Sequence, residues 1–256
     1  MAHSWLQDIL AILSGSAVGL SLSVIGGGGS ILAVPLLIYA VGISDVHIAI
    51  GTSALAVAAN AFVNLVGHWR AGNVNWMCAT IFAAAGIAGA LIGSSLGKIV
   101  DGHKLLNLFA LAMIAVGIAM LRSDTKGREA EFHMTPAIAI RLGGAGLVVG
   151  AISGFFGIGG GFLIVPAMMF GSGMPILQAI GSSLLSVGSF GLTTAVNYAL
   201  SDWVDWVISL LFISGGVVGG IVGVRFATRL AQRRGVLKKI FAGVVFVVAI
   251  LILLRI

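Results

Sequence analysis

The chain has 256 residues, of which 59% are hydrophobic and only 9% are charged, and its formal net charge is +6. Water-soluble domains carry about 25% charged residues, so the composition excludes a water-soluble globular protein. The basic residues lie in short segments between apolar runs, and this placement indicates orientation in a membrane instead of nucleic-acid binding. The single cysteine, Cys78, excludes an internal disulfide, and the five scattered histidines show no metal-ligand spacing.

Apolar runs in chain order predict the membrane-crossing helices. Most of them have the roughly 20 residues that a hydrocarbon core of about 30 Å requires. The chain start lacks the positive segment of a cleavable signal, and its apolar run is too long for one. We therefore expect an all-α, multi-pass integral membrane protein, placed in the inner (cytoplasmic) cell membrane. The runs are 6–42, 46–67, 74–97, 104–121, 137–171, 176–199, 204–224 and 240–254.

The sequence contains two copies of one unit. Segment 19–37 matches segment 150–168, and after a one-residue deletion segment 47–55 matches 177–185. We predict two pseudo-symmetric repeats, 1–122 and 137–256, joined by a polar linker, 123–136. The matched glycines and prolines are Gly19 with Gly150, Gly26 with Gly157, Gly28 and Gly29 with Gly159 and Gly160, Pro35 with Pro166, and Gly86, Gly89 and Gly93 with Gly216, Gly219 and Gly223.

The first unit of each repeat is too long for one crossing. Residues 6–42 would form a helix of about 55 Å at 1.5 Å per residue, and four glycines interrupt them at 26–29. A hairpin, a re-entrant pair and one broken span all remain open. If each broken unit returns to its starting side, eleven of the fourteen lysines and arginines share one side of the membrane, against eight if it crosses once. The positive-inside rule favours the first arrangement, in which three transmembrane helices follow each broken unit and the repeats are inverted.

The glycine breaks are the candidate substrate site. Irregular backbone inside a membrane is tolerated where it lines a cavity or packs against protein. Helix N-termini there offer free N–H groups to an anion, and glycine lets a ligand approach the backbone closely. We expect the two breaks to approach each other and to face one substrate. For Gly89, Gly93, Gly219 and Gly223, close helix packing is the preferred interpretation.

Polar residues on the following helices complete the candidate site. Asn60, Asn64 and His68 are four residues apart and share one helix face. His68 lies in the sequence HWRAGN, which indicates the membrane edge, and is predicted to be interfacial, as are the five tryptophans. Hydroxyls and amides replace part of an oxyanion's hydration shell; alternatively they bond to neighbouring helices, contributing about 0.6–2 kcal/mol each. The candidate substrate-binding residues are Gly26, Gly27, Gly28, Gly29, Ser30, Thr52, Ser53, Asn60, Asn64, Gly157, Gly159, Gly160, Gly161, Ser182, Ser183, Ser186, Thr194 and Asn197.

The acidic residues lie near segment ends or in loops, so no carboxylate is expected at the segment centres. A cation carrier or proton pump normally keeps an intramembrane carboxylate. Dipoles, hydroxyls and amides suit an anion that binds and leaves again. No residue is assigned to catalysis, to a metal or to a cofactor.

The paired GxGGG…P units, each followed about 15 residues on by IGTS or IGSS, resemble the TauE/SafE family of membrane transporters, also described as sulfite exporters. The first copy departs from the pattern with Ser30 where the second has Gly161. The resemblance implies export of a small sulfur-containing anion such as sulfite, a sulfonate or an organosulfonate. We expect a secondary transporter working by alternating access, with the anion and membrane lipids as partners and a homodimer left open. The alternatives are an anion channel, a carboxylate transporter, a membrane scaffold and an embedded enzyme.

Overall fold

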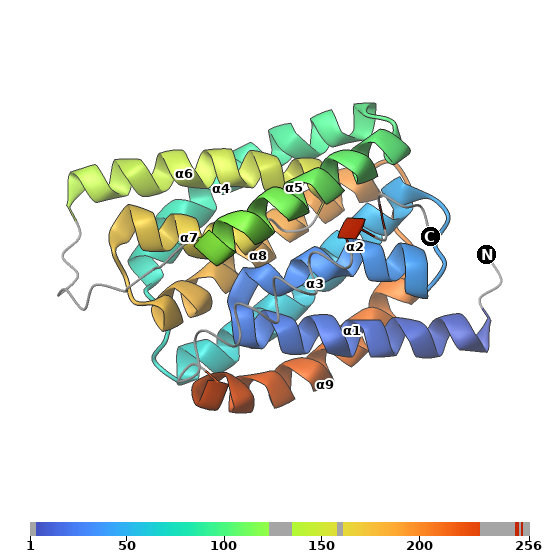
Figure 1. Ribbon diagram of the computed structural model, residues 1–256, viewed down its shortest axis with the longest axis horizontal. Coiled ribbons are helices and arrows are strands. Elements are labelled where there is room, and N and C mark those ends of the chain that lie inside the picture. Colours follow the sequence, from blue (N-terminus) through green and yellow to red (C-terminus); the bar gives the residue numbers. More distant parts are fainter. Residues whose placement is uncertain (1–3, 123–134, 158–160, 231–248, 251, 253–256) are drawn as a thin grey trace.

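The computed structural model describes residues 4–122, 135–157, 161–230, 249–250 and 252, and all regular structure within them is helical. Six helices are long and apolar enough to cross a membrane (Figure 1). The predicted all-α class is therefore confirmed for the described residues; most of the predicted linker and of the last predicted run lie outside them. The six helices are α1 (Trp5–Ile25), α3 (Val46–Arg70), α4 (Trp76–Ile99), α6 (Pro136–Phe156), α8 (Ile176–Ala199) and α9 (Trp206–Leu230).

Several acidic residues have a local structural task at helix starts. Asp45 Oδ1 accepts the backbone N–H groups of His47 and Ile48 at the start of α3. Asp101 does the same at the start of α5 (Gly102–Arg122), and Asp205 at the start of α9. A carboxylate here satisfies otherwise unpaired N–H groups and complements the positive end of the helix. This capping explains why these carboxylates lie at segment ends.

The first unit doubles back at its glycines. Helix α1 ends at Ile25, and Gly26 reverses the chain with φ +73°. A 3₁₀ segment, Gly26–Leu32, the short helix α2 (Ala33–Pro35) and a π-helical turn, Leu36–Ala40, then run back along α1. A Cβ at Gly42 would lie 3.8 Å from Gln7 Nε2, near the start of α1. Residues 6–42 therefore double back, as a hairpin or re-entrant pair does, and do not form one broken span.

The second unit follows the same course. Helix α6 ends at Phe156, and Gly157 reverses the chain with φ +67°. Residues 158–160 lie outside the described residues, and α7 (Gly161–Ser172) follows. A Cβ at Gly171 would contact Leu142 Cδ2 at 3.1 Å, so the end of α7 is back beside the first half of α6.

Glycine-lined helix pairs form the two edges of the bundle: α1 lies along α9, and α4 along α6 (Figure 1). Gly19 faces the Gly216 backbone, and Gly150 faces the Gly86 backbone, in both cases so closely that a Cβ would clash. The packing role predicted for Gly89, Gly93, Gly219 and Gly223 is confirmed. A Cβ on any of the first three would strike a backbone carbonyl of the neighbouring helix, and one on Gly223 would lie 2.7 Å from Ser23 Cβ. Small residues at helix crossings let backbones approach in this way.

Helices α3 and α8 form the centre of the bundle. They are the most buried of the six long helices: 67% of the residues in the most apolar 18-residue stretch of α3 and 72% of those in α8 are buried. They run antiparallel, since Gly181 near the start of α8 lies beside His68 near the end of α3, and Gly51 near the start of α3 lies beside Tyr198. The residues that follow each glycine break are thereby carried into the interior.

Candidate substrate site

The first glycine break is held by the other repeat. Gly27 N–H donates to Ser183 Oγ at 3.3 Å, and Ser183 Oγ donates to Ile180 O at 2.7 Å. A Cβ on Gly26 would lie 2.9 Å from the same Ser183 Oγ. Ser30 Oγ closes the turn by donating to Gly27 O at 2.7 Å. Ser30 and Ser183 are fully buried, so the side chains that hold this break lie in the protein interior.

The second break is held by the first repeat. Ser53 Oγ donates to Ile50 O at 2.9 Å and lies 3.5 Å from Gly157 O. A Cβ on Gly157 would strike Ile50. Each break therefore packs against a serine and an isoleucine of the opposite repeat, at matching positions of the two copies. Of the remaining predicted glycines, Gly161 begins α7, and Gly159 and Gly160 lie outside the described residues.

The two serine contacts lie at opposite ends of the α3–α8 pair, although the 3₁₀ segment Gly26–Leu32 and α7 contact each other. That both breaks face one substrate stays a prediction. Ser183 lies next to Gly181, which is beside His68, whereas Ser53 lies 15 residues earlier on α3. At 1.5 Å per residue, Ser53 and His68 are about 22 Å apart along α3. A single small anion cannot contact both serines at this distance. The physical reason is the antiparallel crossing of α3 and α8, which places their second turns at opposite ends of the pair.

Thr52 and Ser182 anchor loops instead of lining the breaks. Thr52 Oγ1 accepts Asp205 N–H at 2.9 Å, and Ser182 Oγ accepts Asn75 N–H at 2.8 Å. Each hydroxyl thus receives the backbone N–H at the entrance to α9 or α4, across the boundary between the repeats. Thr52 and Ser182 thus bond to neighbouring segments of the protein, which is the alternative to substrate binding that the sequence left open.

Asn60 and Asn64 lie in a buried polar cluster between α1, α3 and α9. Asn64 Nδ2 donates to Asn60 O at 3.0 Å, and Asn64 Oδ1 accepts from Ser23 Oγ, which also lies 2.9 Å from Gly220 O. The Asn60 amide is fully buried against Gly216, yet neither its oxygen nor its nitrogen has a hydrogen-bond partner among the described residues. Buried polar groups are nearly always hydrogen-bonded, so this amide is the strongest sign of an unfilled interaction in the interior.

His68, near the end of α3, belongs to this cluster, so its side chain lies inside the protein. The side chain is 2% exposed, and its Nε2 lies 3.0 Å from Ser23 O. Trp69 and Arg70, which suggested the membrane edge, are exposed, because they point away from α1 on the same helix. Sequence reasoning missed Ser23 altogether. A serine three residues before the glycine run was the available signal.

The remaining predicted residues lie on α8. Ser186 and Thr194 are fully buried, and their hydroxyl oxygens have no hydrogen-bond partner among the described residues. Asn197 binds α4: its Nδ2 donates to Ser94 Oγ at 2.7 Å, and Lys98 Nζ donates to its backbone carbonyl O at 3.0 Å. A lysine at the end of a helix complements the negative end of the helix dipole.

Aromatic rings surround the Lys98 end of α8. The Nζ atom of Lys98 lies 5.6 Å from the Trp203 ring centre and 6.0 Å from the Tyr198 ring centre. His47 stacks on Trp203 with ring centres 4.7 Å apart. Trp203 is therefore packed within the protein, whereas the other four tryptophans, Trp5, Trp69, Trp76 and Trp206, are exposed near helix ends as expected.

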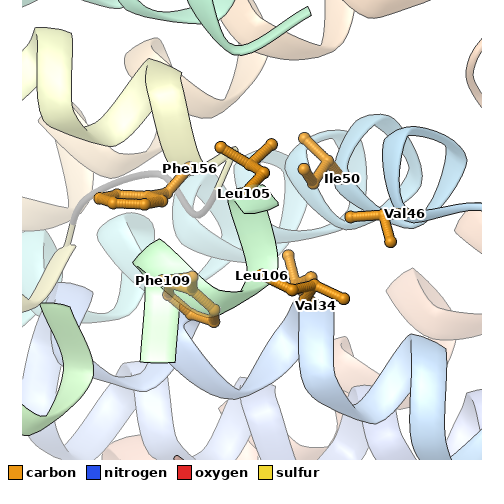
Figure 2. Close-up of a pocket in the computed structure, with 7 residues that line it drawn as sticks. All are labelled: Val34, Val46, Ile50, Leu105, Leu106, Phe109 and Phe156. Atoms are coloured by element: carbon orange, nitrogen blue, oxygen red, sulfur yellow. The ribbon is translucent and has the colours of Figure 1, made fainter. Parts of the chain in front are cut away.

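An apolar recess lies where α5 meets α2, α3 and the end of α6. Figure 2 shows that only hydrocarbon side chains line it, so it offers an anion no hydrogen bond. Its lining residues are Val34, Val46, Ile50, Leu105, Leu106, Phe109 and Phe156. Among the described residues, no group of three histidine, cysteine or acidic side chains is placed to hold a metal ion.

A polytopic helical bundle with buried backbone breaks and uncharged hydrogen-bonding groups has the features of a membrane transporter. The family model described as "Sulfite exporter TauE/SafE" matches residues 11–252, and the chain belongs to this family. It is 51% identical over 248 residues to a probable membrane transporter protein of Xylella fastidiosa strain Temecula1, covering 96% of this chain and 95% of the relative. It is 25% identical to the probable membrane transporter protein YunE of Bacillus subtilis strain 168, over 84% of this chain and 86% of the relative. No solved structure matches the chain significantly.

Proposed function

We propose that this protein is a secondary transporter that exports a small sulfur-containing anion, such as sulfite or a sulfonate, by alternating access. The family description and the names of the relatives support the transporter class. The sulfur-containing substrate follows from the family description. The apolar spans support a multi-pass protein, which we place in the inner cell membrane with lipids as its surroundings.

The repeats are inverted in this proposal. Helices α3 and α8 contain the matched segments 47–55 and 177–185, and they run antiparallel. The edge pairs support the same arrangement, because the first long helix of each repeat packs along the third long helix of the other: α1 along α9, and α6 along α4. Rocking of one repeat against the other would alternately open the two ends of the α3–α8 pair.

The contact between Gly27 and Ser183 carries the proposal. Both a backbone N–H and a hydroxyl are buried there, in a break that each repeat alone leaves incomplete. An oxyanion accepts hydrogen bonds from backbone N–H and hydroxyl groups. When the repeats separate, the anion replaces Ser183 Oγ as the acceptor of Gly27 N–H and accepts the serine hydroxyl itself. Ser53 and the Gly157 break form the equivalent half-site about 20 Å away.

Anion flux into proteoliposomes tests this function. The panel consists of sulfite, sulfoacetate, taurine, a simple carboxylate and chloride, each with and without the same anion trapped inside. An alternating-access exchanger is accelerated by the trapped anion, whereas a channel is not. Flux of a carboxylate alone would keep the transporter and discard the sulfur substrate. Stimulation by no anion would refute alternating exchange.

Serine variants test whether the anion binds at the two glycine breaks. Ser183→Ala and Ser53→Ala are expected to lose most of the flux, because each removes one hydroxyl donor to the anion. Ser214→Ala is the matched control, since Ser214 Oγ makes the same kind of bond within its helix, 2.7 Å to Leu211 O, but is exposed and contacts no break. Full flux in Ser183→Ala would exclude a substrate site at the first break.

A further inference from the structure

The first glycine break has a second attachment that the proposed substrate site does not use. In an α-helix the carbonyl of residue i accepts the N–H of residue i+4, so Gly27 is the regular donor to Ser23 O. Gly27 lies beyond the Gly26 reversal, and its N–H donates to Ser183 Oγ instead. The donor at Ser23 O is His68 Nε2, at 3.0 Å. His68 thus caps the end of α1 at the break.

This contact fixes the form of the imidazole. A carbonyl oxygen only accepts, so Nε2 must carry the hydrogen. The other ring nitrogen, Nδ1, is then a bare acceptor in the neutral form. His68 is 2% exposed, and Nδ1 is buried with no hydrogen-bond partner among the described residues. It is therefore placed to take up a proton, and the buried site has no acceptor for the N–H that results.

No described carboxylate faces His68 to balance that charge. From α1 and α3 its neighbours are Ser23 and Asn64, and from α8 the neighbour is Gly181. The only other titratable side chains of α1 and α8 are Asp8, in the first turn of α1, and Tyr198, at the far end of α8. Turn 71–75 has none, and segment 26–40 and α7 have only Tyr39, one residue from the far end of its segment.

Arg70 is the nearest charged residue along the chain. Arg70, two residues beyond His68 on α3, is exposed. On α9 the side chains of Arg225 and Arg229 lie outside the described residues. Arg70 has the same sign as a protonated imidazole and offers it no balancing charge.

We propose that His68 is a proton switch for the first glycine break, an inference that rests on the proposed transport function. A neutral imidazole caps Ser23 O and keeps the break closed. Protonation gains the attraction of the negative end of α1, but it buries an unpaired cation and a second N–H without an acceptor, which costs more. The protonated form therefore favours the conformation in which the break opens to water. Histidine is the side chain that changes charge between pH 5 and 8.

The pH profile of flux tests the switch. The probe is methanesulfonate, whose charge stays constant between pH 5.5 and 8. Wild-type flux is expected to rise on acidification, by at most about tenfold per pH unit for one proton. His68→Gln retains an N–H for Ser23 O but cannot titrate, so its flux should persist and become independent of pH. His47→Gln, which replaces a histidine at the other end of α3, should keep the wild-type profile. A wild-type slope in His68→Gln overturns the proposal.

Thermal unfolding in detergent tests the same histidine without transport. The closed state binds fewer protons at His68 than the unfolded chain, so wild-type stability should fall as the pH falls. His68→Gln should lose this component, and His47→Gln should keep it. Equal pH dependence in wild type and His68→Gln overturns the switch, including the case in which His68→Gln carries no flux. A third outcome separates the two proposals. If His68→Gln loses the pH-dependent part of the stability as expected, but neither the wild type nor any variant transports an anion, transport is refuted and the proton switch stands.

Discussion

Asn60 and Asn64 provide a direct test of the interior polar cluster, because the same substitution should have opposite effects one helical turn apart. The Asn60 amide is fully buried with neither atom hydrogen-bonded to a described residue. The Asn64 amide accepts from Ser23 Oγ and donates to Asn60 O. Replacing Asn60 by alanine keeps that backbone acceptor, so the Asn64 bonds survive the change.

The magnitudes follow from burial and bonding. A buried amide without a partner costs about 1–3 kcal/mol, and Asn60→Ala removes this cost. The cavity of about 50 Å³ that it leaves costs about 1 kcal/mol at ~24 cal/mol per Å³. Asn60→Ala is therefore expected to change the free energy of unfolding by between zero and about 2 kcal/mol in the stabilising direction. Asn64→Ala loses two bonds of about 1 kcal/mol each and leaves a similar cavity, a destabilisation of about 3 kcal/mol.

Thermal unfolding in detergent without added anion measures the contrast. At about 2–4 °C per kcal/mol for a chain of this size, the Tm values of the two variants should differ by at least about 6 °C. Asn60→Ala should at the same time lose anion flux, because an amide retained at a cost in stability is expected to bind something. A Tm for Asn60→Ala as low as that of Asn64→Ala would refute the reasoning, since the Asn60 amide would then have a stabilising partner.

Three further predictions concern the backbone and the thiol. Gly26→Ala should lose more stability than Gly72→Ala, measured as Tm, because both glycines have φ near +70° but only a Cβ on Gly26 would meet Ser183. Gly150→Ala should destabilise by about 1–3 kcal/mol through its clash with α4, whereas Gly143→Ala, with open space around it, should gain up to about 1 kcal/mol; equal effects would contradict the packing. Cys78 is fully buried, so it should react with a maleimide only after unfolding, and rapid labelling of the folded protein would contradict this.

The helices and their close packing could be predicted from the sequence because they depend on local patterns. Apolar run length determines the spans, and the spacing of Gly89 with Gly93 and of Gly219 with Gly223 is a property of one helix face. The reversal at Gly26 follows from a run of residues that tolerate positive φ. The repeat also indicated which residues occupy equivalent positions.

The contacts between the repeats could not be predicted in this way. Whether Gly27 meets Gly157 or Ser183 depends on how α3 and α8 cross, and nothing within either copy specifies that crossing. Thr52 and Ser53 are adjacent in sequence, yet one anchors a loop and the other faces a break, because neighbouring residues on a helix point in different directions. His68 was assigned to the membrane edge from its neighbours, although burial differs from one residue to the next on a helix surface.

The reciprocal serine contacts also have a consequence for biosynthesis. Ser183 follows Gly27 by 156 residues, so the first break is completed only after most of the chain has been made. Until α8 inserts, the Gly27 N–H and the end of α1 must be satisfied by water, lipid headgroups or the insertion machinery. The first repeat is thus inserted in an unfinished form, and its final geometry is acquired from its partner. Gene fragments that encode either half alone should therefore yield folded protein only when both are expressed together.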